Sequence, residues 1–218
     1  MTTFSTRSTY WAALGGAVLA LLATAGMLVV ILGGVRFQPT DAIEPLQDFL
    51  DLYNDPAAVD GIIAGFTFDS LFLIAYLVVF LGLGARVWQD APLPALVGLI
   101  FGVLTAVLDA TENAHLITYA YTAKNVGPLT VADLAVPGIY LLTNLKWMSA
   151  FVALLTLGLA FPRDTGLELA VKVLMLVFVL VGIAGVLVPA LLLARSLFFI
   201  VGMILFAALF WGYARAAD

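Results

Sequence analysis

The segment PALVGLIFGVLTAVLDATENAHLITY, residues 94–119, decides the fold of this chain. It is long enough to cross a bilayer, since a transmembrane helix needs about 20 predominantly apolar residues. Within this stretch it carries Asp109, Glu112 and His115, the only histidine of the chain. An ionisable group in hydrocarbon costs roughly 2.5–3.5 kcal/mol on insertion scales. The segment therefore predicts a membrane helix whose charged side chains have a partner or a task inside a bundle.

The composition of the whole chain agrees with a membrane location. Of its 218 residues, 64% are hydrophobic and 11% are charged, against about 45–50% and about 25% in soluble domains. We expect an all-α integral membrane protein, a six-helix bundle that forms a single transmembrane domain over residues 1–218.

The residue counts also exclude several kinds of site. The chain has no cysteine and one histidine. Thiolate metal sites, iron–sulfur clusters, bis-histidine haem ligation and multi-histidine metal sites are therefore excluded within a single chain. We expect no metal and no cofactor. The net charge of −5 gives no reason to expect a nucleic-acid partner.

Six apolar segments are long enough to be spans, and basic residues indicate their orientation. The spans are residues 10–34, 61–85, 94–119, 137–161, 168–188 and 190–213. Basic residues favour the cytoplasmic side of a membrane. With the N-terminus inside, that side carries Arg7, Arg86, Arg163, Lys172 and Arg215, and the opposite side carries only Arg36 and Lys124. Both termini are therefore predicted to be cytoplasmic.

The first outer loop, residues 35–60, has a helical pattern of its own. Its apolar residues Ile43, Leu46, Phe49, Leu50 and Tyr53 recur at helical spacing, and acidic residues lie between them. Pro45 fits near the start of such a helix. The pattern predicts a short amphipathic helix on the outer surface, which either caps the bundle, covers the charged site or binds a partner.

Counting from the predicted span ends brings the charges of four spans to one layer. At 1.5 Å per residue these charges lie about 8–14 Å below the outer boundary. They belong to Asp69, Glu112, Lys146 and Arg195. The sequence thus predicts one charged layer in the outer half of the membrane.

Helical spacing puts the polar residues on shared faces. Asp109, Glu112 and Asn113 stand at i, i+3 and i+4, and therefore share one face of their helix. Asp69 and Tyr76, seven residues apart, share one face of the second span, and Thr143 and Lys146, three residues apart, share one face of the fourth span. We expect one ligand- or ion-binding site with the members Asp69, Tyr76, Asp109, Glu112, Asn113 and Lys146, and with His115, Thr143 and Arg195 as further candidates.

The charge count of this layer does not balance. Three carboxylates face one lysine and one arginine, which leaves one negative charge. A proton on one carboxylate, a bound cation or a protonated His115 would compensate it. Structural ion pairing between helices is the alternative explanation for the layer.

The polar pattern resembles that of a known group of membrane proteins. The pattern consists of Phe68-Asp69 with Tyr76, Asp109-x-x-Glu112-Asn113 and Thr143-x-x-Lys146-Trp147, within residues 66–147. It resembles small uncharacterised bacterial integral membrane proteins of four to six spans. The resemblance implies a bacterial inner membrane, and it brings no known activity.

Three functions fit these observations. The first is a binding module for a small polar or cationic ligand or a lipid head group, with membrane lipids as partners, or an accessory subunit with a protein partner in the membrane. The second is proton- or cation-coupled transport, because intramembrane acids recur in proton relays. The third is acid–base modification of a lipid without a metal, with Asp109 and Glu112 as the carboxylate pair.

Overall fold

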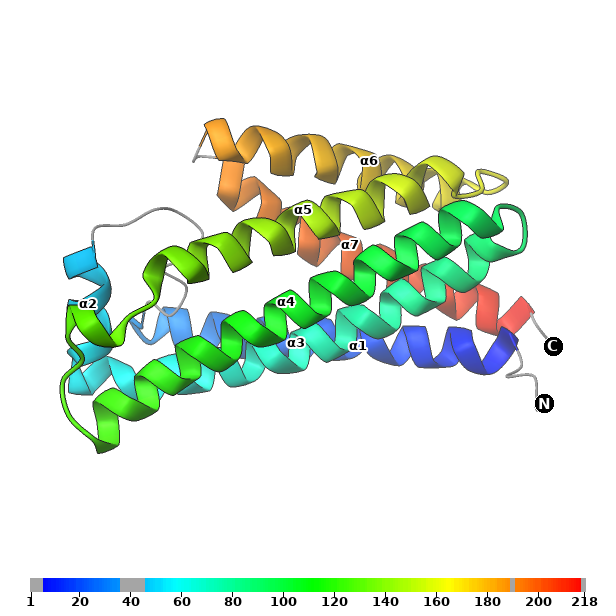
Figure 1. Cartoon of the computed structure of the whole chain (residues 1–218). Helices are drawn as coiled ribbons and strands as arrows, with labels where there is room; N and C mark the ends of the chain where they lie inside the picture. Colours follow the sequence, from blue (N-terminus) through cyan, green and yellow to red (C-terminus); the bar gives the residue numbers. More distant parts are fainter. Residues whose placement is uncertain (1–5, 36–45, 189–190, 217–218) are drawn as a thin grey trace, which may run out of the picture.

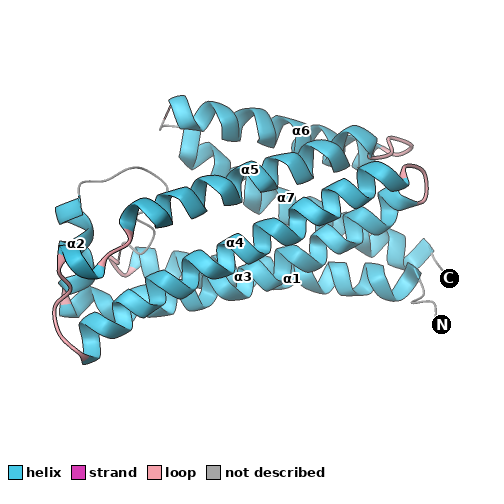
Figure 2. Cartoon of the chain, in the orientation of Figure 1, coloured by secondary structure: helices cyan, strands magenta, loops and turns pink. Residues whose placement is uncertain are grey.

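A computed structural model describes residues 6–35, 46–188 and 191–216, and these residues form an all-α fold (Figure 1; Figure 2). The helices are α1 (Thr6–Leu32), α2 (Leu46–Asn54), α3 (Pro56–Trp88), α4 (Pro92–Asn125), α5 (Val136–Ala160), α6 (Gly166–Leu187) and α7 (Leu191–Ala216). A short 3₁₀ turn, η2 (Val131–Asp133), lies between α4 and α5. Six helices in the described ranges are long and apolar enough to cross a membrane. The predicted all-α, six-span membrane bundle is confirmed.

The six long helices form a closed ring. Each packs on its neighbours along the chain, and α1 also packs along α7, so the order around the ring is α1, α3, α4, α5, α6, α7. The contact between α1 and α3 is close because α1 turns small residues inward, with Ala13, Ala17 and Ala20 fully buried. In Figure 1 the start of α1 and the end of α7 lie at the same end of the ring, which we call the termini end. The opposite end is the α2 end.

Helix α2 covers part of the end of the ring that lies opposite the termini. It buries Phe49, Leu50 and Tyr53 against residues of α3 and α4. The Asn54 side chain donates a hydrogen bond to the carbonyl of Leu129 (3.0 Å) and accepts one from its amide (2.7 Å), which ties α2 to the loop after α4. The predicted amphipathic helix is present from Leu46 to Asn54. Its proposed first residues, Ile43 and Pro45, lie outside the described residues.

The helix bounds differ from the predicted spans, most of all in α3 and α4. Helix α3 begins at Pro56 rather than residue 61, because the Asp55 side chain accepts a hydrogen bond from the Ala57 amide and Pro56 suits the first turn. Helix α4 continues to Asn125 rather than stopping at 119. Asp69 and Glu112 are therefore each 13 residues, or about 20 Å, from the α2 end of their helices. Asp69 and Glu112 therefore lie near the middle of α3 and α4, and the depth of the charged layer in the membrane stays a prediction.

A second polar cluster joins three helices at the termini end. The buried carboxylate of Glu168 on α6 accepts hydrogen bonds from the Tyr213 hydroxyl on α7 and the Thr165 amide. One of its oxygens lies 3.5 Å from the Arg86 guanidinium of α3. These contacts give Glu168 a structural role, because they hold the ends of α3, α6 and α7 together.

Candidate functional site

Lys146 lies at the centre of a buried ion-pair network. Its Nζ atom is 2.9 Å from Asp109 Oδ1 and 2.6 Å from Glu112 Oε2. The two carboxylates come from one face of α4, one turn apart, and Lys146 reaches them from α5. Both carboxylate side chains are less than 10% exposed. The predicted proximity of the polar faces of α4 and α5 is thus observed.

Neutral hydroxyl groups complete this network. The Tyr76 hydroxyl of α3 donates to Asp109 Oδ2 at 2.9 Å, and the Thr143 hydroxyl of α5 donates to Glu112 Oε1 at 2.7 Å. Each of the four carboxylate oxygens of Asp109 and Glu112 therefore has a partner. Buried polar groups that are fully satisfied fix how helices pack. This network joins α3, α4 and α5 and does not offer a free carboxylate oxygen.

Asp69 is in a different situation. Its Oδ2 atom accepts a hydrogen bond from the Asn113 amide of α4 at 2.9 Å, and Asn113 Nδ2 also lies 3.4 Å from Ser70 Oγ. Among the residues that the structure describes, no basic side chain forms an ion pair with Asp69, and Oδ1 accepts no hydrogen bond. The side chain is only 8% exposed and lines an internal cavity. Asp69 is thus the carboxylate of the layer that can receive a ligand.

The cavity occupies the centre of the ring. It has a volume of about 310 Å³, at the lower end of the range of about 300–1,000 Å³ for ligand pockets. All six long helices contribute to its wall, which is mainly apolar. Its phenylalanines are Phe66, Phe72, Phe80, Phe178, Phe198, Phe199 and Phe206. The charged layer therefore forms one polar patch in an aromatic chamber.

Arg195 reaches this cavity from α7. Its side chain is buried, and its guanidinium carbon lies 3.7 Å from the centroid of the Trp147 ring, a cation–π contact. The indole N–H of Trp147 is buried and has no acceptor among the described residues. Trp147 is part of the polar sequence pattern, but the pattern alone predicts no role for it. The signal was a tryptophan in the middle of a span, away from the interface where tryptophan is enriched.

The lining residues carry the charge imbalance that the sequence predicts. Three carboxylates, Lys146 and Arg195 all line the cavity, which leaves one negative charge. Lys146 is shared by two carboxylates, so Asp69 is the acid that forms no ion pair in the described part of the chain. In those residues no group of three His, Cys, Asp or Glu side chains is arranged to hold a metal ion.

His115 is not brought to the cavity. It is exposed, and its Nδ1 atom lies 2.8 Å from the carbonyl oxygen of Thr111 one turn earlier in α4. The buried face of α4 contains Asp109, Glu112 and Asn113. At 3.6 residues per turn, His115 points about 110° away from the centre of that face. His115 therefore does not compensate the charge of the cavity.

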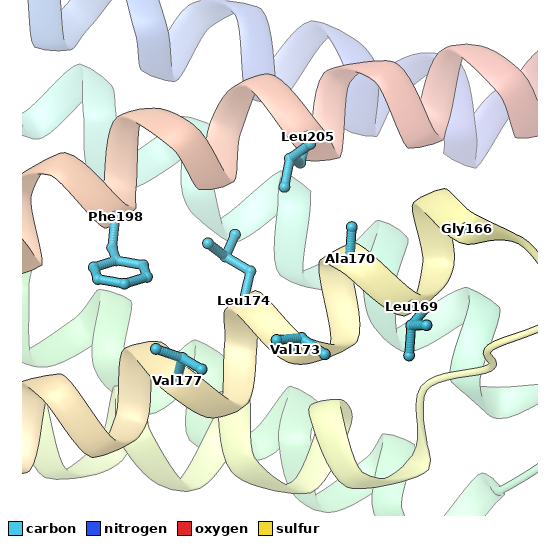
Figure 3. Close-up of a pocket in the computed structure, with 8 residues that line it drawn as sticks. All are labelled: Gly166, Leu169, Ala170, Val173, Leu174, Val177, Phe198 and Leu205. Carbon is cyan, nitrogen blue, oxygen red and sulfur yellow. The ribbon is translucent and has the colours of Figure 1, made fainter.

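A second, outer depression lies between α6 and α7 (Figure 3). We call it the α6–α7 groove, with a volume of about 430 Å³. It is lined by Gly166, Leu169, Ala170, Val173, Leu174, Val177, Phe198 and Leu205, none of which is polar. Leu174 and Phe198 also line the central cavity. The two depressions thus share part of their walls.

No protein-family model, no curated protein and no solved structure matches this chain. This result is consistent with the resemblance to bacterial membrane proteins that have no known activity. The geometry of the cavity is therefore the basis for a functional proposal.

Proposed function

We propose that this integral membrane protein binds an amphiphilic organic monocation in its central cavity, with the cationic group beside Asp69. The observation that carries the proposal is the buried Asp69 carboxylate, which faces an aromatic cavity without a basic partner in the described residues. A buried charge is costly unless it is paired. A bound cation supplies the missing partner.

The charge balance favours a ligand with a single positive charge. The ionisable side chains that line the cavity sum to −1 when all five are charged. One monovalent cation brings the sum to zero, whereas an anion or a dication leaves an unpaired charge in a low-dielectric site. A zwitterionic head group leaves the original imbalance.

The wall around Asp69 favours an organic cation with an apolar body. Phe66, Phe72 and Tyr76 lie within two turns of Asp69 on α3, and all three line the cavity. Aromatic rings attract organic ammonium groups through their faces, with about 0.5–2 kcal/mol for each contact. A strongly hydrated inorganic ion gains nothing from the remaining apolar wall, which an alkyl or aryl group fills.

We also propose where the ligand comes from and how the protein is oriented in its membrane. The ligand comes from the membrane itself, either as a cationic lipid or as a lipophilic cation dissolved in the bilayer. The resemblance implies a bacterial inner membrane, and the basic residues of the sequence favour a cytoplasmic location for both termini. A role as accessory subunit is compatible with this site, since lipid-facing surfaces of the helices stay available to a protein partner.

One specific observation favours proton- or cation-coupled transport as a second candidate. Asp69 has no resident basic partner, so a proton and an organic cation would compete for the same carboxylate. Acid–base catalysis by Asp109 and Glu112 is less well supported, because every oxygen of this pair is already engaged. A general acid or base needs an oxygen within reach of the substrate.

Equilibrium binding of tetraphenylphosphonium to the full chain in lipid nanodiscs tests the proposal. Wild type is expected to bind one ion per chain, and Asp69→Asn to bind at least about tenfold more weakly, a loss of about 1.4 kcal/mol. Asp48→Asn, at an exposed site on α2, is the matched acid-to-amide control and leaves binding unchanged. Equal binding by wild type and Asp69→Asn would refute the proposed site.

A further inference from the structure

The α6–α7 groove extends the central cavity toward the surrounding lipid. Leu169 and Val173, on the α6 side of the groove, are each about half exposed, at 48% and 49%. Because α6 and α7 both cross the membrane, this exposed apolar surface faces hydrocarbon. The outside of the groove is therefore in contact with lipid chains.

Two side chains form the shared wall between the groove and the cavity. Leu174 projects from α6 and Phe198 from α7, and both line the groove (Figure 3). Both residues also line the central cavity. Gly202 of α7 lies opposite Leu174, and a Cβ atom added there would be 3.3 Å from Leu174 Cδ2. Because position 202 has no side chain, the side chains of Leu174 and Phe206 border the space that a Cβ atom would occupy there. The two depressions thus adjoin each other at Leu174 and Phe198.

From these contacts we infer that the α6–α7 groove holds the hydrocarbon tail of the bound cation, and that the ligand moves between lipid and cavity past Leu174 and Phe198. The inference rests on the proposed function and narrows its ligand to a single-tailed amphiphile, such as an alkyltrimethylammonium ion. The ammonium group lies at Asp69, and the tail passes between α6 and α7.

A second path from the cavity to the lipid would run along α1 instead of between α6 and α7. The cavity is also lined by Leu28 and Ile31 near the α2 end of α1, and each of these residues is about half exposed. A tail that left the cavity there would contact α1 instead of α6. The two paths therefore predict labelling of different helices.

Photo-crosslinking locates the tail directly. The probe is a dodecyltrimethylammonium ion with a diazirine at the end of its chain, added to the full chain in nanodiscs of phosphatidylcholine. We expect crosslinks to Leu169, Val173 or Val177 that disappear with excess unlabelled dodecyltrimethylammonium and in Asp69→Asn. Competed crosslinks on Leu28 or Ile31 would overturn the inferred path while the proposed binding function stands. Crosslinks that neither competitor nor Asp69→Asn removes would contradict the proposed function itself.

A substitution in the shared wall provides a second readout. Leu174→Trp fills the passage and is expected to slow association of dodecyltrimethylammonium by about tenfold or more, as obstruction of a gating element does. Leu180→Trp, on the lipid-facing side of the same helix, is the matched control and leaves the rate unchanged. Equal association rates for both variants, with Asp69-dependent binding intact in each, would refute passage between α6 and α7.

Discussion

Removing the amino group of Lys146 is expected to destabilise the protein strongly. In Lys146→Met the carboxylates of Asp109 and Glu112 lose contacts of 2.9 and 2.6 Å and stay buried. The hydroxyls of Tyr76 and Thr143 would still donate to them. Breaking a buried ion pair by removing one partner costs about 3–5 kcal/mol, because the other charge is left uncompensated. We expect a loss of that size in the free energy of unfolding.

Two further variants test whether the loss of stability in Lys146→Met comes from uncompensated buried charge. The triple variant Lys146→Met, Asp109→Asn, Glu112→Gln removes all three charges, so most of the lost stability is expected to return. Asp69→Asn removes a carboxylate that forms no ion pair among the described residues, and is expected to raise the free energy of unfolding by about 1 kcal/mol. Unfolding in mixed dodecylmaltoside and dodecyl sulfate micelles, followed by tryptophan fluorescence, measures all three. A Lys146→Met variant as stable as wild type would refute the account of this network.

Three other variants test the packing around the site. Gly16→Ala is expected to lower the free energy of unfolding by about 1–3 kcal/mol, because the added Cβ would lie 2.8 Å from the carbonyl oxygen of Ala75. The control Gly15→Ala places its Cβ where no atom lies within 4 Å, so it is expected to keep or raise the free energy of unfolding. Tyr53→Phe is expected to leave stability unchanged or to raise it by up to about 1 kcal/mol. Burial raises the pKa of the Tyr53 hydroxyl well above its ordinary value, so the group stays neutral, and it has no hydrogen-bond partner among the described residues. Thr165→Ala is expected to cost about 1 kcal/mol through loss of a helix cap that Thr165→Ser retains. The same unfolding measurement checks each value. A Gly16→Ala variant as stable as wild type would contradict the close contact, and a destabilised Tyr53→Phe variant would contradict the unpaired hydroxyl. Equal losses in Thr165→Ala and Thr165→Ser would contradict the role of the cap.

Hydropathy and helical spacing were sufficient to predict the six spans and the shared polar face of α4. A spacing of i, i+3 and i+4 determines which side chains point the same way, whatever the rest of the fold. Helix ends were predicted less well, because capping by Asp55 and Pro56 decides where α3 begins and hydropathy does not record it.

The difference between Asp69 and Asp109 could not be read from the sequence. Both are aspartates in the middle of apolar helices, and which one meets Lys146 depends on how α3 and α5 rotate against α4. The aromatic wall of the cavity likewise depends on closure of the ring, in which α6 packs on α5 and α7 packs on α1. The exposed position of His115 follows from helical periodicity alone, since it lies off the face that carries Glu112.

The position of a heavy-atom cation in the protein tests the central claim most directly. Tetraphenylarsonium carries an arsenic atom whose anomalous scattering can be located in crystals of the full chain. We predict one arsenic peak inside the ring, beside the Asp69 carboxylate and among Phe66 and Phe72, that is absent in crystals of Asp69→Asn. Arsenic peaks confined to the outer surface, or a peak in the cavity that persists in Asp69→Asn, would contradict the account.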